Sequence, residues 1–123
     1  MKTVIFLDDE RNISDVTWIR YPTQIQVEVV RTFQQFKKCV DALSTLENVM
    51  FSFDHDIQDF ETVNGFEVER TGMDCVKYLV ECMMIRECLK VSDLDVIVHS
   101  QNPIGKENIE GYVRSYRKFA SVT

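Results

Sequence analysis

The sequence has no long apolar run and few basic residues. No stretch approaches the about 18 apolar residues that a membrane span needs, and residues 1–3 lead straight into an apolar segment that ends in acid, which is not a signal-peptide layout. Fourteen Lys and Arg against 20 Asp and Glu give a net charge of -6 at pH 7. We therefore expect a cytoplasmic protein that binds neither a membrane nor duplex DNA over a broad surface.

Several familiar chemical motifs are also missing. The four cysteines contain no C-x-x-C pair, so we expect reduced thiols that serve as small apolar fillers rather than a zinc site. The sequence shows no P-loop, no dinucleotide fingerprint, no Ser-His-Asp pattern and no internal repeat. At 123 residues and 45% hydrophobic content, it predicts a single domain, residues 1–123, with a substantial core.

Four segments have the composition of β-strands: residues 2–7, 25–31, 49–54 and 95–100. The second alternates apolar and polar residues, which is typical of an edge strand. The other three are apolar and end abruptly in polar residues, namely Asp8-Asp9-Glu10, Asp54-His55-Asp56 and His99-Ser100. Because open α/β sheets bind ligands outside the carboxyl ends of their strands, we predict one parallel sheet with one functional edge.

Helical periodicity and capping residues mark the connections. A helix over 32–46 begins at the capping pair Thr32 and Gln35, and one over 71–89 begins at Thr71 and Asp74. A last helix follows Asn102 and runs to about residue 119, and residues 16–19 form at most a short helix. With right-handed crossovers, this order predicts a doubly wound sheet with helices on both faces.

The connection at 57–70 is unusually long. Asn64-Gly65 predicts a type I′ turn inside a small hairpin over 62–68. Two interpretations stay open: a flap that hangs over the functional edge, or a plain surface insertion.

Asp8, Asp9 and Asp54 are the first candidates for chemistry. Carboxylates from adjacent strands repel one another unless a cation neutralises them, and oxygen ligands favour Mg²⁺ or Mn²⁺. Asp56 is a further candidate ligand or a partner that orients a histidine. The alternative is that these carboxylates are solvated strand ends that cap nearby helices.

His55 and His99 are the only histidines, and both follow predicted strands. Near neutral pH, a histidine can act as acid, base or metal ligand. Ser100 is placed to hydrogen-bond a phosphoryl oxygen. Together with a metal, such groups fit phosphoryl chemistry.

Four further residues are candidates for phosphate binding. Arg11 and Lys106 can neutralise a phosphate, although solvated surface cations are an equal alternative. Asn102 and the amides near Gly105 lie at a predicted helix start, where an anion can bind.

Five motifs together resemble the cyclic-phosphate-processing receiver-like family, which is related to the receiver domains of response regulators. In chain order they are Phe6-Leu7-Asp8-Asp9-Glu10-Arg11-Asn12, Val30-Arg31-Thr32-Phe33, Ser52-Phe53-Asp54-His55-Asp56, Thr71-Gly72-Met73-Asp74-Cys75-Val76-Lys77 and His99-Ser100-Gln101-Asn102-Pro103-Ile104-Gly105. The resemblance implies an α/β, receiver-like (flavodoxin-like) three-layer sandwich with a mainly parallel sheet that lacks the fifth strand.

The resemblance also implies roles for individual residues. An ordinary receiver binds Mg²⁺ with an acidic pair, here Asp8 and Asp9, accepts phosphate on an aspartate, here Asp54, and has a hydroxyl residue, here Ser100. The lysine that follows a fifth strand in receivers has no counterpart here. His55, Asp56 and His99 are additions, and the family name implies cyclic phosphates of nucleotides or RNA ends as substrates.

Three functions follow as hypotheses. The first is a metal-dependent phosphoesterase in which Asp8, Asp9, Asp54 and Asp56 hold the metal and Asp54, His55, His99 and Ser100 carry the chemistry, with Asp54 as ligand or as nucleophile. The second is a signalling receiver phosphorylated on Asp54. The third is a non-catalytic binder of a cyclic nucleotide.

Overall fold

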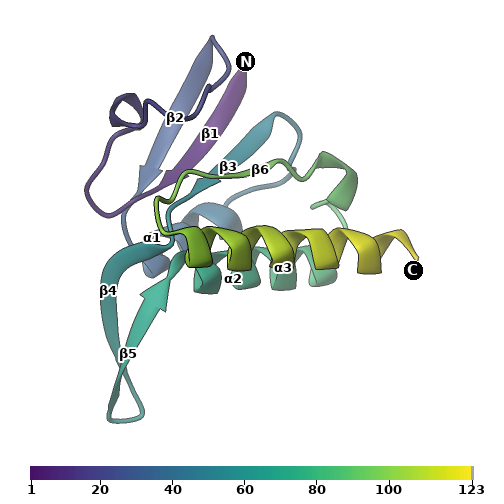
Figure 1. Ribbon diagram of the computed structural model, residues 1–123. Coiled ribbons are helices and arrows are strands. Elements are labelled where there is room, and N and C mark those ends of the chain that lie inside the picture. The colour runs from purple at the N-terminus through teal and green to yellow at the C-terminus, as the bar shows by residue number, and fades with distance from the viewer. Residues whose placement is uncertain (123) are drawn as a thin grey trace.

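The computed structural model describes residues 1–122 and contains a four-stranded parallel sheet (Figure 1). Its strands are β1 (Lys2–Leu7), β2 (Ile25–Val30), β3 (Val49–Phe53) and β6 (Val96–Val98), in the order β2-β1-β3-β6. The predicted strands and the edge position of β2 are confirmed. The apolar strands β1 and β3 occupy the centre, where both faces of a strand are buried.

Three helices follow the strands: α1 (Phe33–Asp41), α2 (Gly72–Ile85) and α3 (Pro103–Ser121). Their predicted starts are confirmed, because Thr32, Thr71 and Asn102 each accept a hydrogen bond from an amide of the first turn. Two predicted ends are wrong: α1 stops at Asp41 rather than 46, and α2 at Ile85 rather than 89.

Tertiary contacts explain both early ends. Leu46 and Leu89 are buried, as the helical periodicity predicted, but both lie in the irregular segments that follow the helices. Arg86, in extended backbone, ends α2 and sends its guanidinium to the carbonyls of Val40 and Leu43, which satisfies the end of α1.

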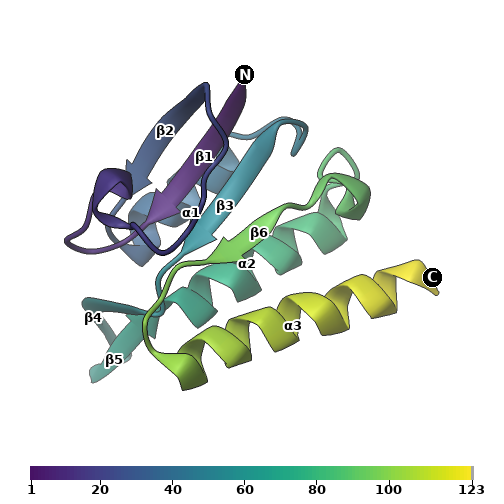
Figure 2. The same cartoon turned by 45° about the horizontal axis from the view of Figure 1, so that its top comes forward.

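The two faces of the sheet are covered differently. We call the side with all three helices the helix face; its core includes Phe36, Phe51 and Phe53 and receives side chains from α1, α2 and α3. The opposite side, the second face, carries Val4 and Phe6 beneath residues 8–24 (Figure 2).

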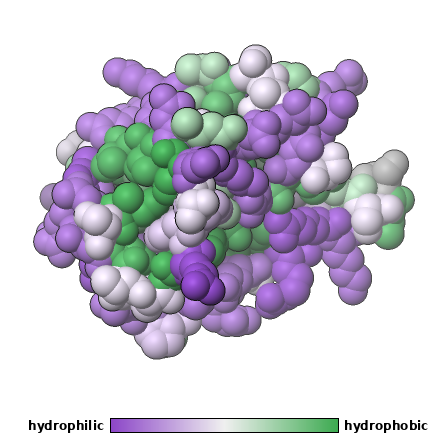
Figure 3. Space-filling view, turned by 90° about the horizontal axis from the view of Figure 1, so that it is seen from above, coloured by the Kyte–Doolittle hydropathy of each residue, from purple (hydrophilic) through white to green (hydrophobic). Residues whose placement is uncertain are grey.

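Residues 8–24 form the third layer without an α-helix. Residues 16–19, for which the sequence predicted at most a short helix, are not helical. The segment contains only a 3-10 helix, η1 (Ile13–Asp15), bounded by extended backbone at Asn12 and Val16. The prediction of helices on both faces of the sheet is therefore wrong. Turn-forming polar residues prevent a longer helix, yet Val16 still reaches the core. Hydrophobic surface shows between hydrophilic residues when the molecule is seen from above (Figure 3).

The long connection is a hairpin of β4 (Asp56–Val63) and β5 (Phe66–Thr71). Positive φ at Asn64 (52°) and Gly65 (82°) agrees with the predicted type I′ turn. The hairpin is longer than predicted, and its tip projects away from the sheet instead of hanging over it (Figure 1). Its base is tied to α1, because the Phe33 amide donates to Asp59 Oδ2 at 2.9 Å.

The remaining elements add little to the site. A second 3-10 helix, η2 (Val91–Asp93), leads into β6. The cysteines are free thiols, and Cys39 and Cys75 are buried as predicted, but Cys88 is exposed and fills no core space. Within residues 1–122, no helix is long and apolar enough to cross a membrane.

Candidate functional site

The register of the central strands brings three carboxylates together. Leu7 pairs with Phe53, so the residues that follow, Asp8 and Asp54, emerge side by side at the sheet edge. One oxygen from each of Asp8, Asp9 and Asp54 lies within 4.8 Å of the others. The structure therefore assembles the three-carboxylate cluster that the strand ends predicted.

Asp8 is fully buried and rigidly held. Burial alone would raise its pKa, but the amides of Arg11 (2.8 Å) and Glu10 (3.0 Å) both donate to Oδ1 and, with His99, lower the pKa of Asp8 overall. Arg31 secures the same loop, donating to the carbonyls of Asp8 and Arg11. Asp8 thus stays ionised in a fixed orientation.

Asp54 is ionised less readily. Burial, and then repulsion from Asp8, raise its pKa to about 6, although the His55 amide donates to Oδ1 at 2.9 Å. Gly72, the first residue of α2, lies against the Asp54 carbonyl so closely that a Cβ would overlap with it. The close packing of α2 thus fixes the Asp54 backbone, and the buried carboxylate lies beside Asp8, where a divalent cation would favour its ionised form.

His99 lies beneath the cluster on the second face. Its side chain is fully buried and its ring stacks on Phe6, with 4.5 Å between centroids. Nε2 lies 3.0 Å from Asp8 Oδ2, and Nδ1 lies 2.7 Å from Ser52 Oγ, which in turn lies 2.7 Å from the Tyr21 hydroxyl. A buried chain of hydrogen bonds thus runs from Tyr21 to Asp8.

The hydrogen-bond partners of His99 determine which group donates and which accepts at each step from Tyr21 to Asp8. Burial outweighs the attraction of Asp8 and lowers the pKa of His99, so the ring is neutral at neutral pH. Because the Asp8 carboxylate only accepts, we assign the proton to Nε2. Nδ1 then accepts from Ser52, and Ser52 accepts from Tyr21. His99 acts on Asp8 from behind and does not line the pocket.

His55 lies on the helix side of the cluster. Its Nδ1 is 2.9 Å from Asp56 Oδ1, and Asn102 donates to Asp56 Oδ2 at 3.0 Å. The Asn102 and His55 hydrogen bonds lower the pKa of Asp56. The ring lies against Gly105, where a Cβ would overlap with it. A surface pair of His55 and Asp56 is thus fixed between β4 and α3.

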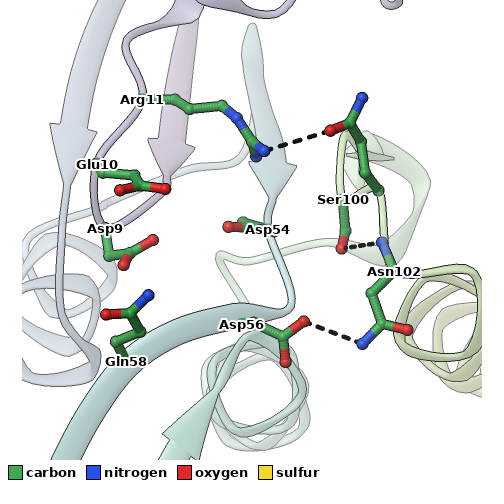
Figure 4. Close-up of a pocket in the computed structure, with 9 residues that line it drawn as sticks. Asp9, Glu10, Arg11, Asp54, Asp56, Gln58, Ser100 and Asn102 are labelled. Carbon is green, nitrogen blue, oxygen red and sulfur yellow. Dashed lines mark hydrogen bonds between the residues drawn. The ribbon is translucent and has the colours of Figure 1, made fainter.

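A pocket of about 200 Å³ opens at this edge of the sheet (Figure 4). One side, the acidic wall, consists of Asp9, Glu10 and Gln58, and the opposite side, the donor wall, carries Ser100 and Asn102. Gln101 also lines the pocket. Asp54 and Asp56 lie between the walls, and Arg11 reaches across toward Gln101, with which it makes a 3.4 Å hydrogen bond.

Arg11 owes its position to the third layer. Its guanidinium lies over the Trp18 ring, 5.4 Å from the centroid, and 3.5 Å from Asp8 Oδ2. Trp18 in turn donates from Nε1 to the His99 carbonyl at 2.9 Å. Residues 8–24 therefore fix the cationic group of the pocket.

The structure brings most, but not all, of the predicted residues to the pocket. Its lining includes the predicted Asp9, Arg11, Asp54, Asp56, Ser100 and Asn102. Asp8, His55, His99, Gly105 and Lys106 are outside the lining, and the Gly105 amide is bonded to Asn102 Oδ1. Asp56 contacts His55 and Asn102 rather than the three-carboxylate cluster.

Sequence reasoning missed several residues of the site. Ser52 carried a usable signal, because it is a polar residue inside an apolar strand. Tyr21, Trp18 and Gln58 lie in irregular or insertion segments, where periodicity carries no information about which way a side chain points.

Comparisons with known proteins agree with this geometry. Curated proteins and solved structures give no match to the chain. The family model described as the cyclic-phosphate processing receiver domain matches residues 3–115, which include all of the parallel sheet except Lys2, the acidic cluster and both pocket walls. The chain therefore belongs to the cyclic-phosphate processing receiver domain family.

Proposed function

We propose that this protein is a metal-dependent phosphoesterase that opens a cyclic phosphate on a nucleotide or an RNA end. The observation that carries the proposal is that two members of the three-carboxylate cluster, Asp9 and Asp54, line a pocket whose opposite side carries hydrogen-bond donors. Family membership supports cyclic-phosphate processing as the general role. The catalytic step and its metal are our inference.

Asp8, Asp9 and Asp54 are the proposed metal ligands, and Mg²⁺ or Mn²⁺ fits them. All three supply oxygen, and burial, followed by repulsion from Asp8, raises the pKa of Asp54, so a cation bound beside the carboxylate would favour its ionised form. When bound, such an ion would polarise the phosphate and lower the pKa of a water molecule. Asp8 holds its orientation through the amides and His99 before any ion arrives.

The donor side of the pocket would bind the phosphoryl oxygens. Arg11 brings a positive charge, and Ser100 and Asn102 bring a hydroxyl and an amide. Donors fixed before the reaction stabilise the charge that develops on phosphoryl oxygens during ester cleavage.

The two histidines would have different roles in the reaction. His55, paired with Asp56 at the pocket edge, is the better candidate for proton transfer, because Asp56 lines the pocket. His99 is fully buried with both ring nitrogens engaged, which supports a role in orienting Asp8. Direct proton transfer from His99 to substrate would require the Asp8 contact to open.

A second candidate is a receiver-type phosphoacceptor. Asp54 follows β3 and faces Ser100 across the pocket, which is the arrangement that would accept a phosphoryl group on a carboxylate. This function predicts stable labelling of Asp54 by a small-molecule phosphodonor, with a lifetime of minutes or longer. The absence of a labelled species would reject it.

The decisive experiment is phosphorus NMR with Mg²⁺ or Mn²⁺ and a panel of 2′,3′-cyclic and 3′,5′-cyclic nucleotides and RNA ends. We expect one cyclic resonance to convert to a monoester with wild type and with the remote control Asp93→Asn, but not with Asp54→Asn. Broadened ligand lines without conversion would favour a non-catalytic binder. An unchanged spectrum for every substrate would overturn the phosphoesterase.

A further inference from the structure

Gln58 is the one neutral side chain on the acidic wall of the pocket. Figure 4 shows its amide beside the Asp9 carboxylate, across the pocket from Ser100 and Asn102. Within residues 1–122, this amide has no hydrogen-bond partner. A side chain that can both donate and accept is therefore presented to the pocket uncommitted.

The backbone at Gln58 adopts an uncommon, strained conformation. Gln58 has φ of 48°, in the left-handed region that side chains with a Cβ rarely adopt, and the hairpin register shifts between Asp56 and Asp59. Bulges of this kind re-aim side chains beside functional sites. An uncommon conformation at a pocket wall is an observation that calls for a functional explanation.

The neighbours of Gln58 maintain this conformation. Ile57 is buried in the helix-face core at 2% exposure, and Asp59 is fixed by the Phe33 amide at the start of α1. With both neighbours held by the fold, the residue between them points into the pocket. Its orientation is thus a product of the hairpin base and not of Gln58 itself.

The chemistry of the acidic wall defines what it can bind. Glu10, which is not among the proposed metal ligands, can only accept hydrogen bonds when ionised and repels a phosphate, and any Asp9 oxygen that the metal does not use likewise only accepts. Hydroxyl groups suit such a wall, because they donate to carboxylates and also accept from the Gln58 amide. The phosphate itself belongs on the opposite side, at Arg11 and Ser100.

We propose that Gln58 is a specificity residue that hydrogen-bonds the sugar hydroxyls of the substrate. The pocket would then select a phosphate carried on a ribose over a bare phosphate group. This inference rests on the proposed function, because it takes the phosphate to lie between the metal ligands and the donor wall.

The chain offers a matched pair of variants for the test. Gln58→Gly removes the amide and relieves the left-handed backbone, and Gln24→Gly relieves the same conformation (φ 52°) at an exposed site outside the pocket. Both glycine variants should melt at or up to about 3 °C above wild type, since the strain lost outweighs the added chain entropy. Any loss of binding in Gln58→Gly is then not a folding defect.

Binding is measured by calorimetry with Mg²⁺ and four probes: inorganic phosphate and the 2′-, 3′- and 5′-monophosphates of adenosine. We expect Gln58→Gly to weaken the tightest nucleotide about five- to tenfold, the loss of about one hydrogen bond, and to leave phosphate unchanged. Gln24→Gly should match wild type for all probes.

The outcomes separate the two claims. Equal nucleotide affinity in wild type and Gln58→Gly, or an equal loss for phosphate, overturns the role of Gln58 while the phosphoesterase stands. A wild-type protein that binds none of the four probes overturns the proposed function and this inference with it.

Discussion

The surroundings of the two histidines differ although both follow neighbouring strands at one edge of the sheet. His99 follows β6 and faces the second face, where it is fully buried and bonded at both ring nitrogens. His55 follows β3 by two residues, has an 18% exposed side chain and contacts Asp56 and Gly105 near the surface. The register pairs Phe53 with Val98, so His99 corresponds to Asp54 and His55 lies one position further on. The difference teaches that a shift of one position at a strand end separates a support for a ligand from a candidate reactive group.

The largest effect should come from removing the buried ring. His99→Ala leaves a cavity beside Phe6 and unpairs Ser52 and Asp8, so we expect a loss of about 3–4 kcal/mol in the free energy of unfolding. His55→Ala should cost about 1 kcal/mol, because its ring is partly exposed. Urea denaturation of both variants at pH 7 measures the difference. Equal losses would contradict the contrast between the two environments.

The next effect is a gain in stability from Asp54→Asn. The folded-state pKa of Asp54 is raised from 3.8 to about 6, so the folded protein binds this proton more tightly than the unfolded chain does. The stabilisation is full below about pH 3.8 and is lost as the pH rises through about 6. At pH 7 the ionised carboxylate is a cost, and the neutral amide should stabilise the fold by about 2 kcal/mol.

Urea midpoints between pH 4 and 7.5 test this prediction. The advantage of Asp54→Asn should shrink steadily toward pH 4, and Mg²⁺ should stabilise wild type more than the variant. A variant advantage that is constant with pH would show that Asp54 ionisation is not its cause. Asp93→Asn, far from the cluster, serves as the control and should show no such dependence.

A smaller effect should follow from shortening the hydrogen-bond chain behind Asp8. Ser52→Ala leaves Tyr21 and His99 without this partner and should cost about 1.5 kcal/mol. Tyr21→Phe removes only the outer link and should cost about 0.5 kcal/mol. If the chain orients Asp8, Ser52→Ala also weakens Mn²⁺ binding severalfold, measured by electron paramagnetic resonance. Unchanged Mn²⁺ affinity would reduce the chain to a structural role.

Gly105→Ala should destabilise the fold by about 1 kcal/mol and should act mainly on the position of His55. The new methyl group would overlap with His55 at Cβ as well as in the ring, so residue 55 must shift and the His55 ring is displaced. We expect lower turnover at unchanged Mn²⁺ affinity, the opposite of Ser52→Ala. Turnover that matches wild type would remove His55 from the proposed chemistry.

The functional edge was predictable because strand signals and charge coincide in this sequence. Phe51, Phe53 and their neighbours mark a buried strand, and the carboxylates that follow can only lie at its exposed end. Helix starts were predictable for a similar local reason, since Thr32 and Thr71 satisfy amides of the next turn. The ends of the helices were not predictable from local signals, because the carbonyls at the end of α1 accept hydrogen bonds from Arg86, which is remote in sequence.

The third layer and the hairpin base show where sequence reasoning stops. Trp18 and Tyr21 have no periodic neighbours, yet one fixes Arg11 and the other begins the chain to Asp8. Of the two interpretations of the hairpin, a flap over the edge or a plain surface insertion, neither fits fully: its tip projects outward, and its base, through Gln58, contributes to the pocket. Side-chain direction in such segments depends on the partners that the fold supplies.

The sequence by itself determined the strands and the polar edge at which Asp8 and Asp54 meet, because hydrophobic periodicity is a local property of the chain and the carboxyl ends of parallel strands lie at one edge of the sheet. Only the tertiary structure decided which histidine is buried, how Asp8 is held and where Gln58 points. These outcomes depend on burial and on hydrogen bonds between residues up to 91 positions apart, whose free energies exist only once the layers have packed together.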